Sequence, residues 1–148
     1  PNIPLSPSGT NIEPDNYILN LHGFVGYFDS LKNSPYELDI TTPIDFKNTS
    51  ALQYVTKELS ADGKKTSLKY IASRYFDLTD NPMMFGDLEI EKFKVGHIDF
   101  ELGVYSPHKI YSANKIKKSL LQMLKAQVTY LRNFKGAENY SILVRWQR

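Results

Sequence analysis

The feature that most constrains the fold is a long amphipathic segment at residues 113–135. Apolar side chains recur there at helical spacing, and Gly136 occupies the usual stop position after the last turn. The stripe is made of Ile116, Leu120, Leu124, Val128 and Leu131, widened by Met123 and Phe134. A helix with one apolar face must pack that face against another element, and strand-like segments surround this one. The sequence therefore predicts a long helix lying on a β-sheet.

Alternation of apolar and polar residues predicts the strands of that sheet. The clearest case is residues 98–105, where Ile98, Phe100 and Leu102 share one side while Asp99 and Glu101 point to the other. Further strands are expected at residues 17–28, 36–40, 88–94 and 140–146. The strands follow one another too closely for regular βαβ crossovers, so we expect antiparallel pairing.

Two segments fit either kind of secondary structure. Residues 50–59 fit a short helix that ends at Asp62-Gly63, but the same dipeptide is a favoured hairpin turn. We favour the helix. Residues 68–78 also fit both patterns, and their aromatic and β-branched content favours a strand.

The fold predicted from these elements is α+β. One antiparallel β-sheet packs against one long C-terminal amphipathic helix, with one possible short additional helix. The length of 148 residues suits a single domain, expected at residues 17–148. Residues 1–16 contain four prolines and no sustained periodicity, so they are expected to form a flexible N-terminal arm.

Charge is unevenly distributed along the chain. Residues 109–148 hold nine basic side chains and a single acidic one, whereas residues 1–50 hold six acidic side chains and two lysines. Three lysines fall in the first turns of the predicted helix, where the helix macrodipole disfavours each by roughly 0.3–1 kcal/mol. The candidate contact residues for an acidic or phosphate-bearing partner are Lys115, Lys117, Lys118, Lys125, Arg132 and Lys135. Alternatively, carboxylates of the sheet, such as Glu89 and Glu91, neutralise them within the chain.

Signals for catalysis are weak. The three histidines have no metal-ligand spacing, and the glycines form neither a P-loop nor a dinucleotide fingerprint. The absence of cysteine excludes disulfides and thiolate chemistry. Asp99 and Glu101 share a strand face and could serve acid–base chemistry, but we favour the simpler interpretation of a solvated outer face. We therefore expect no enzyme, no cofactor and no metal.

The function inferred from charge and shape is that of a non-enzymatic structural, assembly or adaptor protein. It would self-associate and engage an acidic protein or nucleoprotein surface through the basic helix, with an anionic membrane surface as a further partner. A sequence-tolerant nucleic-acid-binding protein is the main alternative, and a carboxylate-dependent enzyme is the third. No signal peptide or apolar run of about 20 residues is visible, which suggests an intracellular or virion-associated protein.

One family resemblance supports the structural interpretation. The order of the strand GHIDFELGVY, the long helix and the strand YSILVRW resembles the core of matrix proteins of small negative-strand RNA viruses. The resemblance covers about the last third of the sequence and includes no diagnostic motif. It implies a viral or phage structural protein that coats nucleocapsids and touches membranes.

Overall fold

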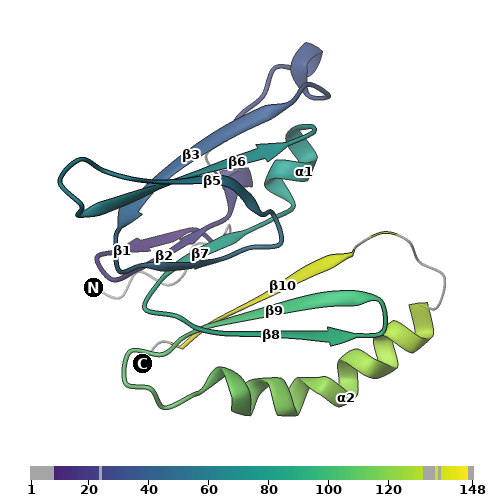
Figure 1. The fold of residues 1–148 in the computed structure, drawn as a ribbon. Coiled ribbons are helices and arrows are strands. Elements are labelled where there is room, and N and C mark those ends of the chain that lie inside the picture. The colour runs from purple at the N-terminus through teal and green to yellow at the C-terminus, as the bar shows by residue number, and fades with distance from the viewer. Residues whose placement is uncertain (1–8, 24, 132–135, 137, 147–148) are drawn as a thin grey trace.

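The computed structural model describes residues 9–23, 25–131, 136 and 138–146. Ten strands and two α-helices form the described part of the chain, together with two short 3-10 helices at Leu21–Gly23 and Asp29–Leu31 (Figure 1). The strands are β1 (Asn11–Glu13), β2 (Asn16–Leu19), β3 (Tyr36–Pro43), β4 (Lys47–Thr49), β5 (Tyr54–Leu59), β6 (Lys65–Ala72), β7 (Met83–Gly86), β8 (Glu89–Val95), β9 (Ile98–Tyr105) and β10 (Asn139–Arg145). The helices are α1 (Tyr75–Thr79) and α2 (Ala113–Leu131).

The strands form three sheets rather than one. Sheet A has the order β1-β2-β7-β4, sheet B the order β3-β6-β5, and sheet C the order β10-β9-β8. Strands hold 44% of the described residues and helices, including the 3-10 helices, 23%, so this part of the chain is mostly β with one long helix. The predicted fold, a single antiparallel sheet under one helix, is therefore wrong. Alternation along a strand reports which side is buried, but it carries no information on which strands pair.

Sheet C contains a parallel pair of strands, so the expectation of antiparallel pairing is wrong for this pair. β10 runs parallel to β9 in continuous register from Asn139 opposite Asp99 to Arg145 opposite Tyr105. The reason is α2, which lies between the two strands in sequence and returns the chain to the end of the sheet where β9 begins. The segment from β9 to β10 is thus one βαβ crossover, and β8 pairs with β9 in the antiparallel sense.

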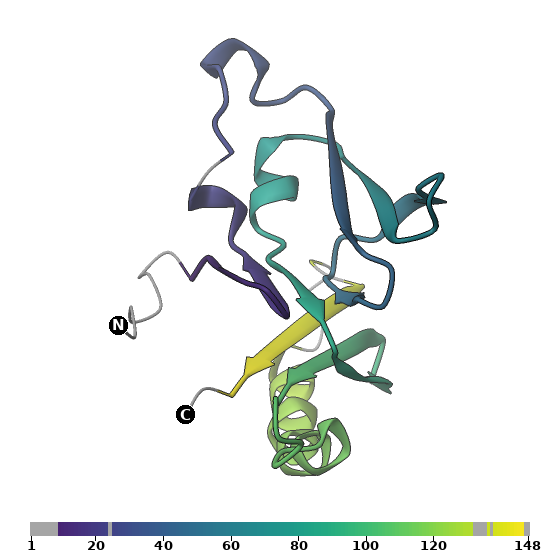
Figure 2. The same cartoon turned by 90° about the vertical axis from the view of Figure 1, so that its left-hand side faces the viewer.

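Helix α2 covers one face of sheet C, and the other two sheets lie on the opposite side (Figure 2). Leu124 of α2 is buried with Val95 and Phe100 of the sheet, and Ala113 at the helix start is buried with Leu102. The prediction that Phe100 and Leu102 share the buried side of this strand is therefore confirmed, and that side faces α2. No helix in the described part of the chain is long and apolar enough to span a membrane.

Sheets A and B share the main core. Tyr70 of β6 and Phe85 of β7 are fully buried, together with Leu21 from the first 3-10 helix. The outward side of β9, expected to face solvent, is partly covered by sheet A. Gly103 lies against Thr49 of β4 so closely that a Cβ atom at residue 103 would overlap the Thr49 side chain. A glycine at residue 103 lets the two sheets approach.

Several local predictions fail for identifiable reasons. Residues 54–59 form strand β5, not a helix, because Asp62-Gly63 makes the hairpin turn to β6 and Gly63 adopts a φ of +66°. The strand expected at residues 17–28 ends at Leu19. Part of the expected arm, residues 11–13, forms β1 and pairs with β2. The division into an arm and a domain stays a prediction.

Candidate functional site

The lysines singled out in the sequence occupy different environments on α2. Lys117 Nζ lies 2.6 Å from Glu91 Oε2 and 5.7 Å from the centre of the Phe93 ring, so this lysine is bound by the chain's own sheet. Lys115, Lys118 and Lys125 are exposed and form no ion pair with any described residue. Their contact with an acidic partner stays a prediction. The last two candidates, Arg132 and Lys135, lie outside the described residues.

Glu89, one of the sheet carboxylates expected to offset the basic helix, contacts the start of α2 at the helix backbone rather than at a lysine. The Ala113 amide donates a 2.9 Å hydrogen bond to Glu89 Oε2, and the Lys115 amide donates to Ser112 Oγ. A carboxylate at a helix N-terminus offsets the macrodipole that the lysines oppose. Glu89 comes from β8, so the compensating charge is distant in sequence and adjacent in space.

A polar network joins the two ends of the described chain. Arg145 Nη2 of β10 lies 2.6 Å from Glu13 Oε2 of β1, and the Arg145 side chain is 4% exposed. Hydrogen bonds, first from Arg145 and then from Asn11, hold the pKa of Glu13 below its ordinary value. The Tyr105 hydroxyl donates a 2.6 Å hydrogen bond to Asp15, and burial followed by this bond raises the pKa of Tyr105. These contacts tie sheet A to sheet C.

The carboxylates considered for acid–base chemistry are engaged in cross-strand ion pairs. Glu101 Oε2 lies 2.9 Å from Lys92 Nζ, and Asp99 Oδ2 lies 3.0 Å from Lys94 Nζ. Each pair joins directly opposed residues of β8 and β9. Such pairs stabilise a sheet, so their geometry gives Asp99 and Glu101 a structural role.

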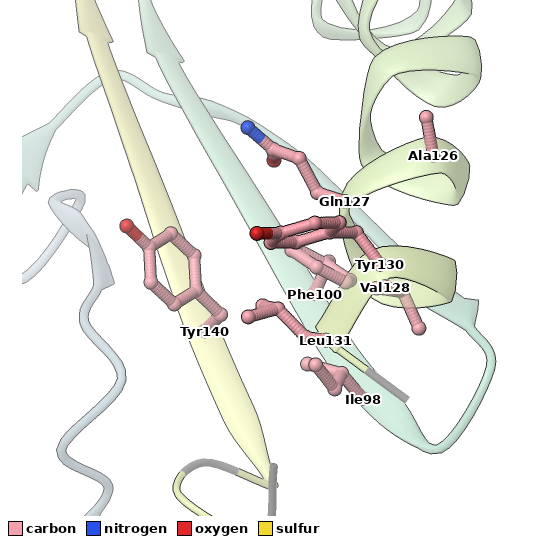
Figure 3. A pocket seen from close by; sticks show the side chains of 8 residues that line it. All are labelled: Ile98, Phe100, Ala126, Gln127, Val128, Tyr130, Leu131 and Tyr140. Atoms are coloured by element: carbon pink, nitrogen blue, oxygen red, sulfur yellow. The ribbon is translucent and has the colours of Figure 1, made fainter. Parts of the chain in front are cut away.

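An apolar groove of about 620 Å³ lies between α2 and β10 (Figure 3). Ile98 and Phe100 of β9 lie between its walls, and Tyr140 of β10 faces the helix across them. The helix contributes Ala126, Gln127, Val128, Tyr130 and Leu131. Tyr130 is 89% exposed and Tyr140 54%, so the groove is open to solvent. Sequence periodicity assigned Val128 and Leu131 to the packed stripe and gave no sign of this opening.

Comparisons with known proteins place the chain in a peptidase family. The model of the Peptidase M61 N-terminal domain matches residues 3–87, which is more than half of the sequence. The chain belongs to the Peptidase M61 N-terminal domain family. A search of curated proteins found no match.

Solved structures with a similar fold are larger proteins. An aminopeptidase N family protein from Idiomarina loihiensis matches with a TM-score of 0.75 and 19% identity, over 92% of this chain and 22% of that one. An M1 zinc metallopeptidase from Deinococcus radiodurans matches with a TM-score of 0.57 and 13% identity, over 95% of this chain and 35% of that one. At these identities the likeness concerns the fold. The chain spans between 22% and 35% of the length of these two proteins.

These findings overturn the function inferred from the sequence. The expectation of a non-enzymatic structural or assembly protein, of viral or phage matrix type, is wrong, and the nucleic-acid-binding alternative falls with it, because the family is that of a peptidase domain. The expectation of no enzyme is contradicted as well, because the chain belongs to the N-terminal domain family of a peptidase. The strand–helix–strand order that suggested matrix proteins is a general crossover unit and is not specific to any one function.

Proposed function

We propose that this chain is the N-terminal β-module of a peptidase and supports a zinc-bearing catalytic part that lies outside residues 1–148. The observation that carries the proposal is the family match over residues 3–87, which names an N-terminal domain. The similar fold of the Idiomarina loihiensis protein adds support, since the chain covers only 22% of it.

The side chains of the described residues do not fit a zinc site. No group of three histidine, cysteine, aspartate or glutamate side chains among them could hold a metal ion. His22 lies 3.5 Å from Asp80, His97 occupies the turn between β8 and β9, and His108 follows β9. Zinc sites in proteins take three or four such ligands converging on one point. No catalytic step is therefore assigned to this chain.

The role that we assign to the chain is structural support of the catalytic part. The network of Glu13, Asp15, Tyr105 and Arg145 fixes sheet A on sheet C, and Gly103 lets them meet closely. A catalytic site requires its groups to be held in place by packed surroundings. A cross-braced module of this kind supplies one rigid wall for such a site.

Two measurements test the proposal. We expect an H-E-x-x-H helix to be encoded in the same gene as this chain or in the gene of a co-purifying subunit. Such a helix supplies two zinc ligands and the general base of a metallopeptidase. The purified 148-residue chain is expected to bind no zinc by equilibrium dialysis and to leave aminoacyl p-nitroanilides intact. Stoichiometric zinc with hydrolysis by the chain alone would contradict the proposal, as would a native protein with no zinc peptidase part.

A further inference from the structure

Among the edge strands of the described residues, β10 has the least protection against further pairing, because its single charged residue, Arg145, is its last one. Exposed sheet edges are usually blocked by shortness, charge, proline or a bulge. β1 and β4 have three residues each, and β3 carries acidic residues and Pro43. β5 has a register irregularity and adjacent charges, and β8 holds four charged side chains. β10 pairs without interruption over seven residues, and residues 139–144 include no charge and no proline.

The unpaired backbone groups of β10 can be identified from its pairing with β9. The Trp146 amide donates to the Tyr105 carbonyl, and the Glu138 carbonyl accepts from the Asp99 amide. Backbone groups alternate sides along a strand, so even-numbered residues bond to β9 and odd-numbered residues point away from it. The amides and carbonyls of Ser141 and Leu143 therefore face the open edge. Neither residue's backbone bonds to another described residue on that side.

The apolar groove lies beside the same edge. α2 packs on β8 and β9, which leaves the α2-facing side of β10 uncovered at Tyr140 (Figure 3). A strand added next to β10 would direct alternate side chains into this opening, where Val128 and Leu131 form the helix wall. At this place, β10 has both a hydrogen-bonding edge that no described residue pairs with and a side-chain face that α2 does not cover. A segment of extended backbone placed along β10 would satisfy both.

Sheet C also lies beyond the region that defines the family. The match to the N-terminal domain ends at residue 87, and β8 begins at Glu89. In the two similar solved proteins, most of the polypeptide lies outside the part that resembles this chain. Sheet C therefore follows the matched region, which is the reason for placing the remainder of the peptidase beside it.

From the unguarded edge and the adjoining groove, we propose that β10 pairs with a further β-strand from the part of the peptidase outside residues 1–148. Alternate apolar side chains of that strand fill the groove between α2 and β10. The proposal rests on the role proposed above, in which a larger catalytic part exists. It adds the place of attachment and the chemistry of the attached segment: extended backbone with apolar residues at every second position.

The test uses the 148-residue chain labelled with ¹⁵N and a model strand. The probe is the acetylated and amidated heptapeptide Lys-Val-Thr-Val-Thr-Val-Lys, and its control carries N-methyl groups on the five central residues. We expect the probe to shift the Ser141 and Leu143 amide signals and to slow their hydrogen exchange, with a dissociation constant of about 1 mM because a free peptide loses conformational freedom on pairing. The N-methylated peptide should leave both signals unchanged.

Substitutions at the edge isolate the backbone contribution. Ser141→Pro removes an outward amide and should weaken probe binding about fivefold, the effect of one net hydrogen bond. Ser141→Ala keeps that amide and should bind like the unmodified chain. If Ser141→Pro does not fold, Tyr140→Lys provides the second variant, since a lysine guards the edge from an exposed position. The matched control is Val55→Lys on the β5 edge, expected to have no effect.

Four outcomes would overturn the proposal. The first is no shift at Ser141 or Leu143 up to about 10 mM probe. The second is equal binding of the N-methylated peptide. The third is micromolar affinity, which would indicate a receptor for free peptides. The fourth is a dimer that Ser141→Pro converts to monomer in light scattering, which would assign the edge to a second copy. The assay involves neither zinc nor hydrolysis, so its result is independent of the search for the catalytic part.

Discussion

Substituting Gly103 tests how closely sheets A and C must approach. A Cβ atom built at Gly103 would overlap Thr49 Cγ2 and lie 3.0 Å from Thr49 Cβ and 3.3 Å from its Oγ1. Thr49 is fully buried and shares a 3.2 Å hydrogen bond with Ser141 Oγ of β10, so its side chain has little room to move. In Gly103→Ala, β4 and β9 must therefore separate.

The magnitude follows from two opposing effects. Overpacking a closely packed site costs about 1–3 kcal/mol, and the fixed position of Thr49 favours the upper part of this range. Replacing a strand glycine by alanine returns about 0.5–1 kcal/mol through the lower entropy of the unfolded chain. We expect a net loss in the free energy of unfolding of about 2 kcal/mol. For a chain of this size, that loss lowers the Tm by about 4–8 °C.

Urea and thermal unfolding followed by circular dichroism measure the effect. Thr49→Ser removes the overlapping methyl group, so the double variant Gly103→Ala/Thr49→Ser should be more stable than the sum of the two single effects by about 1 kcal/mol. The control is Gly26→Ala, whose new Cβ would meet nothing within 4 Å. A Gly103→Ala protein within about 0.5 kcal/mol of the unmodified chain, or strict additivity with Thr49→Ser, would refute the close approach of the two sheets.

Three further effects are expected from the charged contacts. Because the pKa of Glu13 is lowered in the folded state, its contact with Arg145 stabilises the fold at pH values above the unfolded-state pKa. This stabilisation is lost as the pH falls through the folded-state pKa. Glu13→Gln should therefore lower the free energy of unfolding by about 1 kcal/mol at pH 7, after allowance for solvent screening, and weaken the dependence of stability on pH in the acid range. Glu89→Gln should cost about 0.3–1 kcal/mol at low salt and less in 1 M NaCl, because it removes the charge at the start of α2. Lys117→Gln and Glu91→Gln should show a coupling energy of about 0.5–1 kcal/mol in a double-mutant cycle, and a value near zero would mean that the 2.6 Å pair is not maintained in solution.

Periodicity located the elements that bury one face. The helix begins at Ala113 as expected, β9 occupies the expected residues, and β10 lies one residue before the segment expected for it. The burial of Phe100 and Leu102 follows from the same alternation. Short strands gave no signal, because β1 and β4 have three residues each and owe their existence to their partners. The choice of a helix at residues 50–59 failed because β5, at Tyr54–Leu59, is wholly exposed and has no buried face to set a period.

Charge located part of the site residues, and Glu91 was among the sheet carboxylates expected to neutralise them, which its contact with Lys117 confirms. Lys117 was identified from a run of basic residues, but the position of Glu91 beside it depends on the pairing of β8 with β9 and the packing of α2 on both. The groove could not be predicted from the sequence either. An apolar stripe on a helix has the same sequence pattern whether the sheet covers all of it or leaves part of it exposed.

The contacts across residue 87 decide how the chain can be divided for study. Met84 is fully buried and packs with Leu88 and Tyr105, which both lie after that residue. Cutting where the family match ends would expose this methionine to water and leave Asp15 without its hydrogen-bond donor. A fragment ending at residue 87 should therefore aggregate when expressed, whereas one that runs through β10 should remain in solution.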